Sequence, residues 1–203
     1  MMFKVQTINR HRMKVDGEGV TTLVGLYGCP LQCKYCINET VLKEAPYKEY
    51  TPDALLQVVM QDYCYFVATN GGVTFGGGES LLHSEVIQEF IRILPEHVSV
   101  NLETSLNVKQ DAVIPLLEPV HQFIIDIKSM NGSIYEAYTK LPNQRVLENL
   151  QYIAEHNYQH KCRIRVPRIP EFNDEADIEN SVSVLRNLGF ENIDVFSYII
   201  KED

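Results

Sequence analysis

Short runs rich in β-branched residues alternate with amphipathic stretches along most of this chain. Strands that alternate with helices pair in parallel, because each crossover helix returns the chain to the same end of the sheet. Phe3–Ile8 is a candidate for an additional edge strand. The six strands that we predict for the parallel sheet are Val20–Tyr27, Gly72–Phe75, Val98–Leu102, Phe123–Ile127, Lys161–Val166 and Asn192–Ser197.

The stretches between these strands carry helix signals. Thr51 can cap a helix whose first residue is Pro52, and Gly189 is placed to end the last one. The helices that we expect cover residues 51–67, 84–94, 110–117, 133–140, 145–157 and 175–188.

The number of strands agrees with the length of the chain. At 203 residues it is shorter than the roughly 250 residues of a complete eight-stranded (β/α) barrel. We therefore predict an α/β fold, an open, partial (β/α)6 TIM-like barrel in a single domain. Residues 1–19 form an N-terminal lead-in and residues 20–198 form the barrel.

The charge balance narrows the range of partners. There are 18 Lys and Arg residues against 27 Asp and Glu residues, a net charge of −9, whereas binding to nucleic acid backbones relies on clustered cations. There is no apolar run of about 18 residues to span a membrane. The first 16 residues do not resemble a signal peptide. We expect a cytoplasmic protein that binds neither nucleic acid nor membrane.

Three of the five cysteines, Cys29, Cys33 and Cys36, follow the first parallel strand with the spacing C-x3-C-x2-C. Thiolates this close together are typical ligands of an iron–sulfur cluster, and three of them leave one iron of a four-iron cluster open. A zinc site completed by His11 or His83 is the alternative. Cys64 and Cys162 fall on regular elements, where we expect small core side chains.

Polar groups stand at the carboxyl end of every predicted parallel strand, the edge where barrel enzymes place their reactive groups. Asp126 and Lys128 share a face and can form a salt bridge with each other, and Arg165 can pair with a carboxylate. We expect the histidines at 83, 97, 121, 156 and 160 to be exposed. The groups that follow the cysteines are Gly77-Gly78-Glu79, Glu103-Thr104-Ser105, Asp126-Ile127-Lys128, Arg165 and Tyr198.

The cysteine motif, with Tyr35 before its last cysteine, resembles the signature of the radical S-adenosylmethionine (SAM) superfamily. The resemblance implies a [4Fe-4S] cluster on Cys29, Cys33 and Cys36 whose open iron is chelated by SAM. It also implies reductive cleavage of SAM to a 5′-deoxyadenosyl radical, which removes a hydrogen atom from the substrate. In such enzymes the cofactor supplies the chemistry and the protein supplies the positioning.

Further segments resemble the activating enzymes of glycyl radical enzymes, the pyruvate formate-lyase activating enzyme group. These are Asp16–Val20, Glu103–Ser105, Ile125–Lys128, Arg165 and Pro170–Asp174. The glycine run with Glu79 resembles the GGE motif of the wider radical SAM superfamily, which binds the SAM amino group. The resemblance implies catalytic roles for Asp126 and Lys128, which would lie between SAM and substrate, and a monovalent cation is a candidate further ligand. The cofactor-binding residues that it implies are Tyr35, Asn38, Gly77, Gly78, Glu79, Glu103, Ser105 and Arg165.

The sequence also departs from that group. Glu18 replaces a proline, Thr21 an arginine and Glu103 an aspartate. A histidine follows the tyrosine that corresponds to Tyr198 in the group, whereas here Ile199–Asp203 follow, so we expect its substrate contact to be missing.

The activity that we expect first is hydrogen abstraction from a glycine Cα of a partner protein, with a flavodoxin or ferredoxin as electron donor. Alternatives within the same chemistry are a peptide or small-molecule substrate, or activation of an anaerobic ribonucleotide reductase. A non-catalytic iron–sulfur or zinc binding module is the alternative from a different class.

Overall fold

The computed structural model describes residues 1–39, 42 and 45–198. The predicted parallel sheet is present, and each of its strands pairs with the next one along the chain. The six strands are β2 (Val20–Leu26), β4 (Gly72–Gly77), β5 (Ser99–Thr104), β6 (Gln122–Asp126), β7 (Cys162–Arg168) and β8 (Ile193–Ser197). The partial barrel predicted from the alternation is therefore confirmed.

Two antiparallel strands extend this sheet on the β2 side. β1 (Phe3–Met13) pairs with β2, and β3 (Lys48–Tyr50) pairs with β1. β1 is longer than expected because its pairing shifts around His11, at φ 57°, and resumes between Arg12 and Thr21. β3 was not expected, since three residues are too few to show a strand period. The N-terminal lead-in is thus part of the sheet.

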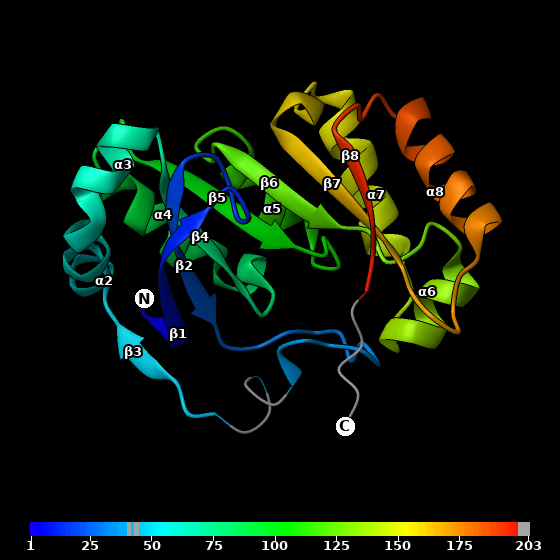
Figure 1. The fold of residues 1–203 in the computed structure, drawn as a ribbon, viewed down its shortest axis with the longest axis horizontal. Coiled ribbons are helices and arrows are strands. Elements are labelled where there is room, and N and C mark those ends of the chain that lie inside the picture. Colours follow the sequence, from blue (N-terminus) through cyan, green and yellow to red (C-terminus); the bar gives the residue numbers. More distant parts are fainter. Residues whose placement is uncertain (40–41, 43–44, 199–203) are drawn as a thin grey trace.

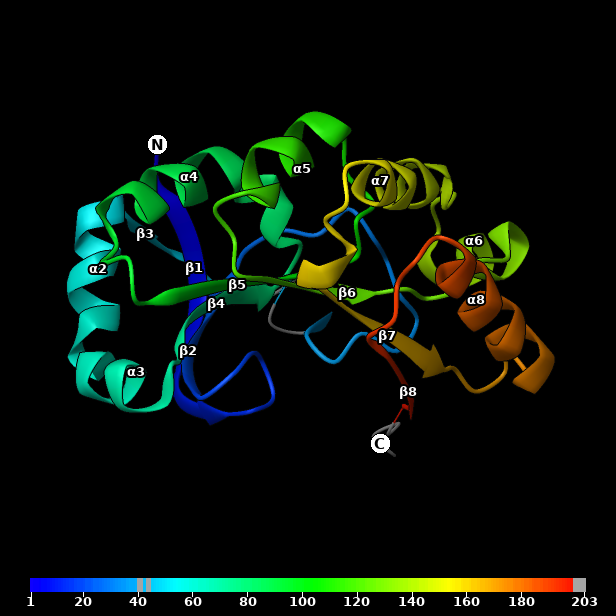
Figure 2. The same ribbon diagram turned by 90° about the horizontal axis from the view of Figure 1, so that it is seen from above.

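The helices lie along the outer, convex side of the curved sheet (Figures 1 and 2). The sheet order is β3-β1-β2-β4-β5-β6-β7-β8, so β3 and β8 are its two edges and the barrel stays open. None of the helices in the described ranges is long and apolar enough to cross a bilayer. The helices are α2 (Pro52–Val59), α3 (Tyr63–Thr69), α4 (Ser84–Ile93), α5 (Gln110–Leu117), α6 (Gly132–Thr139), α7 (Gln144–Glu155) and α8 (Glu175–Asn187).

The single helix expected over residues 51–67 is instead two helices joined by a 3-10 turn at Met60–Asp62. The reason is Asp62, whose fully buried carboxylate turns toward the sheet. It accepts hydrogen bonds from Arg10 Nε at 2.9 Å and Thr22 Oγ1 at 2.6 Å, and His11 Nε2 lies 3.0 Å from it. A buried carboxylate needs such partners, and reaching them interrupts the regular helical ladder.

The core lies between the sheet and its helices. Phe3 of β1 stacks on Phe75 of β4 with ring centroids 5.3 Å apart, and Phe90 of α4 meets both rings edge-on. Cys162 is 2% exposed and is a core side chain, as predicted. The same prediction for Cys64 is wrong, because this residue of α3 lies on the solvent side of its helix and is exposed.

Candidate functional site

The cysteine motif lies in the loop that follows β2, at the carboxyl edge of the parallel strands. Cys29, Cys33 and Cys36 are all half-buried and free of disulfides. The loop is tied to the end of α6, where Gln32 N donates to the Thr139 carbonyl at 2.9 Å and Lys34 N donates to the Tyr138 carbonyl at 3.2 Å. These backbone bonds attach the cysteine loop to α6 at this edge of the sheet.

The environment of Cys29 and Cys33 disfavours the thiolate form, which is the form that binds iron. Burial raises the pKa of Cys29 to about 12 and that of Cys33 to about 11, and the neighbouring thiols contribute to the rise at Cys29. Positive iron would offset this cost by stabilising the thiolates. Within residues 1–39, 42 and 45–198, no three His, Cys, Asp or Glu side chains are already arranged to hold a metal ion. The prediction of a cluster site therefore rests on the position of the three cysteines in one loop and on the electrostatic effects of their thiols on one another.

The zinc alternative gains no support from the two candidate histidines. His11 Nε2 lies 3.0 Å from a carboxylate oxygen of Asp62, and His83 Nε2 lies 2.9 Å from the Tyr27 carbonyl. His83 is half-buried, so its expected exposure is wrong. The other four histidines that we expected to be exposed, at positions 97, 121, 156 and 160, are exposed.

The glycine run that ends β4 lies directly beside the start of the cysteine loop. Gly78 N donates to the Leu26 carbonyl, Glu79 N donates to the Gly28 carbonyl, and Asn38 Nδ2 donates to the Gly77 carbonyl at 2.8 Å. A Cβ at Gly78 would lie 2.2 Å from the Gly28 carbonyl oxygen. The absence of a side chain at this position is therefore needed for the two segments to approach each other.

Glu79 joins the ends of β4 and β5. It is 1% exposed, and its carboxylate accepts from Leu81 N at 3.2 Å, from Thr104 Oγ1 at 2.6 Å, and from Ser105 N and Oγ at 2.9 and 2.6 Å. Burial raises the pKa of Glu79, and these donors oppose the rise. Glu79 and Ser105 thus bind each other here, and their roles toward a cofactor stay predictions.

Three further predicted residues meet on the concave face. Arg165 lies between two carboxylates, with Nη1 4.0 Å from Glu103 and Nε 3.5 Å from Asp126 Oδ1. The guanidinium also lies 4.9 Å from the centroid of the Phe196 ring, a cation–π contact. The pairing of Arg165 with neighbouring carboxylates is therefore confirmed.

The carboxyl group of Glu103 has a raised pKa. Burial, together with the nearby carboxylates of Asp16 and Asp126, raises its pKa from 4.5 to about 7, and Arg165 opposes this rise. The Cβ of any side chain at Gly76 would lie 2.1 Å from Glu103 Oε2, so the glycine run makes room for this carboxylate. Glu103 therefore titrates close to neutral pH.

This shift predicts a pH dependence of folding. The unfolded chain ionises Glu103 near pH 4.5, before the folded chain does, so folding stability falls as pH rises from about 4.5 to about 7. Glu103→Gln should remove a decline on the order of 3 kcal/mol. Urea unfolding at pH 5 and pH 8 measures it. An equal pH dependence in the variant and the parent would show that Glu103 keeps its ordinary pKa.

Lys128 stands just beyond β6 and is almost fully buried. Its Nζ donates to Asp126 Oδ2 at 3.3 Å and to the Tyr198 hydroxyl at 2.9 Å, which confirms the salt bridge expected from the spacing. The pKa of Lys128 is well above its ordinary value; burial lowers it, but Asp126 and Tyr198 more than offset that effect. Lys128 also acts electrostatically on Cys33, so the network reaches the cysteine loop.

Sequence reasoning missed the part of Glu171 in this site. Its Oε2 accepts from Lys34 Nζ at 2.6 Å and from the Tyr35 hydroxyl at 2.8 Å. The expected absence of a substrate-side histidine concerns residues 199–203, which lie outside the described residues.

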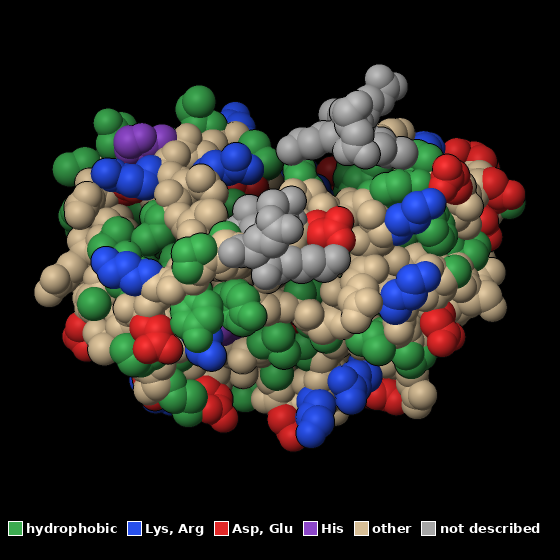
Figure 3. Space-filling model, turned by 90° about the horizontal axis from the view of Figure 1, so that it is seen from below, with side chains coloured by type: hydrophobic (Ala, Val, Ile, Leu, Met, Phe, Trp, Pro, Cys, Tyr) green, Lys and Arg blue, Asp and Glu red, His purple; other side chains and the backbone are tan. Residues whose placement is uncertain are grey.

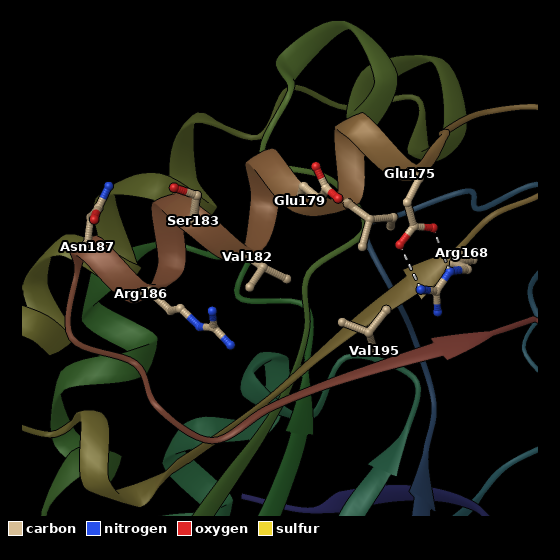
Figure 4. A pocket seen from close by; sticks show the side chains of 9 residues that line it. Arg168, Glu175, Glu179, Val182, Ser183, Arg186, Asn187 and Val195 are labelled. Atoms are coloured by element: carbon tan, nitrogen blue, oxygen red, sulfur yellow. Dashed lines mark hydrogen bonds and ion pairs between the residues drawn. The ribbon is translucent and has the colours of Figure 1, made fainter.

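Figures 3 and 4 show the face of the molecule near the cysteine loop and a separate pocket on the outside. Figure 3 shows the molecule from the side of the cysteine loop, with Lys and Arg dispersed rather than gathered in one patch. A pocket of about 430 Å³ lies on the outside, between α8 and Val195 of β8, with an Arg168–Glu175 ion pair at one end (Figure 4). None of the residues predicted for the site lines that pocket.

Comparison with known proteins identifies the family. Residues 23–185 match the model of the radical SAM superfamily. The chain is 31% identical to the pyruvate formate-lyase 1-activating enzyme of Escherichia coli K12, over 91% of this chain and 76% of that one. It is 27% identical to the choline trimethylamine-lyase activating enzyme of Oleidesulfovibrio alaskensis, over 98% and 83% of the two chains.

Solved structures of other members share the fold at low identity. SuiB of Streptococcus suis matches 86% of this chain with a TM-score of 0.66 at 16% identity, although the match spans only 40% of SuiB. The anSMEcpe structure with bound AdoMet matches 87% of this chain with a TM-score of 0.65 at 15% identity, over half of that chain.

The fold and the cysteine loop define a radical SAM domain, and the family match agrees. The chain belongs to the radical SAM superfamily, within the group of activating enzymes for glycyl radical enzymes.

Proposed function

We propose that this protein is a radical SAM enzyme that activates a glycyl radical enzyme by removing a hydrogen atom from a glycine Cα. The observation that carries the proposal is that Cys33, one of three free thiols in one loop, lies within electrostatic reach of Lys128 and Asp126, which belong to the Glu103–Arg165–Asp126–Lys128 network. It is supported by the 31% identity to an activating enzyme of Escherichia coli.

Cys29, Cys33 and Cys36 would hold a [4Fe-4S] cluster. When bound, the cluster supplies one electron that splits SAM into methionine and a 5′-deoxyadenosyl radical. The amino acid end of SAM is a zwitterion, and the site offers a complement to each charge. Glu103 can accept a hydrogen bond from the ammonium group, and Arg165 can hold the carboxylate with its planar pair of donors.

Asp126 and Lys128 lie on the substrate side of this arrangement. Lys128 Nζ is held between a carboxylate and a tyrosine hydroxyl, so its charge has a fixed position at the edge of the barrel. A fixed ammonium can orient a backbone carbonyl of an entering peptide. The sheet is open between its β3 and β8 edges. We propose that a segment of a partner protein approaches the site from this side.

The partners follow from this chemistry. The substrate is a protein or peptide segment, and the electron donor is a flavodoxin or a ferredoxin. We place the enzyme in the cytoplasm, where reducing conditions keep these cysteines as thiols. We propose that residues 1–203 act as a single domain.

The test is co-incubation of the reconstituted protein with a glycyl radical enzyme from the same genome, SAM and a reductant, followed by electron paramagnetic resonance. A protein radical on the glycine of the partner is expected, and it should be absent when SAM is omitted. Consumption of SAM without a radical on any such partner would contradict activation and favour a peptide or small-molecule substrate. A radical formed only on an anaerobic ribonucleotide reductase would assign that substrate instead.

A further inference from the structure

Glu171 has a backbone conformation that is unusual for a charged residue. It lies between β7 and α8 and has a φ of 69°, in the left-handed region that glutamate seldom adopts. Glycine would adopt this conformation without strain. A glutamate in its place indicates that its side chain makes contacts that offset the strain.

These contacts all reach the cysteine loop. The two residues that donate to Glu171 Oε2 are Lys34, at 2.6 Å, and Tyr35, at 2.8 Å. Both stand between Cys33 and Cys36, the most closely spaced pair of the three predicted ligands. One carboxylate oxygen therefore holds the two side chains that separate these cysteines.

The residue that follows Glu171 adds a second contact to the same segment. The Phe172 ring meets the Tyr35 ring edge-on at 6.2 Å, and Lys34 Nζ lies 5.5 Å from its centroid. Phe172 also meets the ring of Tyr138, whose carbonyl accepts from Lys34 N. The cysteine loop is thus held from the β7–α8 side as well as from α6.

We propose that Glu171 is a positioning residue for the cluster, holding the Cys33–Cys36 segment against the loop that follows β7. The proposal rests on the proposed function, because it takes Cys33 and Cys36 as cluster ligands. Since β7 also carries Arg165, the contact links the predicted cluster ligands to the strand of the predicted SAM contact. Residues that orient metal ligands in this way commonly affect metal affinity by about 10- to 100-fold.

The first test needs no cluster. Hydrogen exchange of the Lys34 amide is measured in the metal-free protein, its Glu171→Gly and Glu171→Gln variants, and a Glu175→Gln control. Glu171→Gly removes both the contact and the strain, so its overall unfolding midpoint should be unchanged or higher. The Lys34 amide should nevertheless exchange about five- to tenfold faster, because two exposed polar contacts are lost.

The Glu171→Gln and Glu175→Gln variants show whether the exchange rate of the Lys34 amide depends on the charge and on the position of the contact. Glu171→Gln keeps an acceptor oxygen without the charge, so we expect an intermediate rate. The control residue Glu175 makes a comparable exposed ion pair with Arg168 at 2.9 Å but does not contact the cysteine loop. Glu175→Gln should leave the exchange of the Lys34 amide unchanged. Equal exchange rates in the parent and Glu171→Gly would overturn the proposal.

The second test uses the anaerobically reconstituted protein. Loss of the cluster's visible absorbance to an added iron chelator should be about tenfold faster in Glu171→Gly and unchanged in Glu175→Gln. Cluster loss at the parent rate in Glu171→Gly would overturn the role toward the cluster. If the parent itself takes up no cluster, the proposed function fails, and the exchange experiment still decides whether Glu171 holds the loop.

Discussion

Cys33→Ala is expected to abolish the visible absorbance of the reconstituted protein and to reduce its bound iron to background. A four-iron cluster held by three thiolates has no spare protein ligand, and two thiols from the same loop cannot replace the third. Cys33 is also the predicted ligand on which Lys128 and Asp126 act electrostatically. The measurement is iron and sulfide content together with the absorbance spectrum, under anaerobic conditions.

The matched control is Cys64→Ala. Cys64 is exposed on α3 and is not part of the cysteine loop, so removing its thiol should leave iron content and absorbance unchanged. A full cluster in Cys33→Ala would contradict the ligand assignment. Zinc uptake by the parent in place of iron would favour the zinc-module alternative.

Glu79→Ala is expected to lower the free energy of unfolding by about 3–5 kcal/mol. The substitution removes the acceptor of two backbone N–H groups, on Leu81 and Ser105, and of the hydroxyls of Thr104 and Ser105. Buried donors without partners are costly, and the space left by the side chain adds to that cost. Urea-induced unfolding followed by circular dichroism measures the change.

Glu85→Ala serves as the control for this substitution. Glu85 is exposed in the first turn of α4, where a carboxylate contributes only a few tenths of a kcal/mol through the helix dipole. A loss in Glu79→Ala no larger than in Glu85→Ala would show that the four hydrogen bonds do not stabilise the β4 and β5 ends. The role of Glu79 would then be sought at the cofactor.

The fold was predictable from the sequence wherever local and long-range preferences agree. The β-branched runs and the capped helices specify parallel pairing, and the six parallel strands begin and end within three residues of the expected ones. The break between α2 and α3 was not predictable, because it depends on Asp62 reaching Arg10 and Thr22, which are distant in sequence. β3 was not predictable for a related reason, because a strand of three residues is specified by its pairing with β1.

The candidate site shows the same division. The strand ends indicated which residues gather at one edge, since parallel strands bring their carboxyl ends together. Which of these side chains contact each other depends on distances in the folded chain, and the spacing of residues in the sequence does not give those distances. Glu79 and Ser105 are joined, and Glu171 reaches Lys34 and Tyr35 across more than 130 positions of sequence.

Cleavage of SAM by this chain can be measured in a single assay. The protein is reconstituted anaerobically with iron and sulfide, reduced with dithionite and incubated with SAM, and 5′-deoxyadenosine is quantified by chromatography. We expect 5′-deoxyadenosine to accumulate with the parent and not with Cys33→Ala. A parent protein that holds a complete, reduced cluster and forms no 5′-deoxyadenosine, or a Cys33→Ala variant that still forms it, would show that this chain does not cleave SAM through a cluster on Cys33.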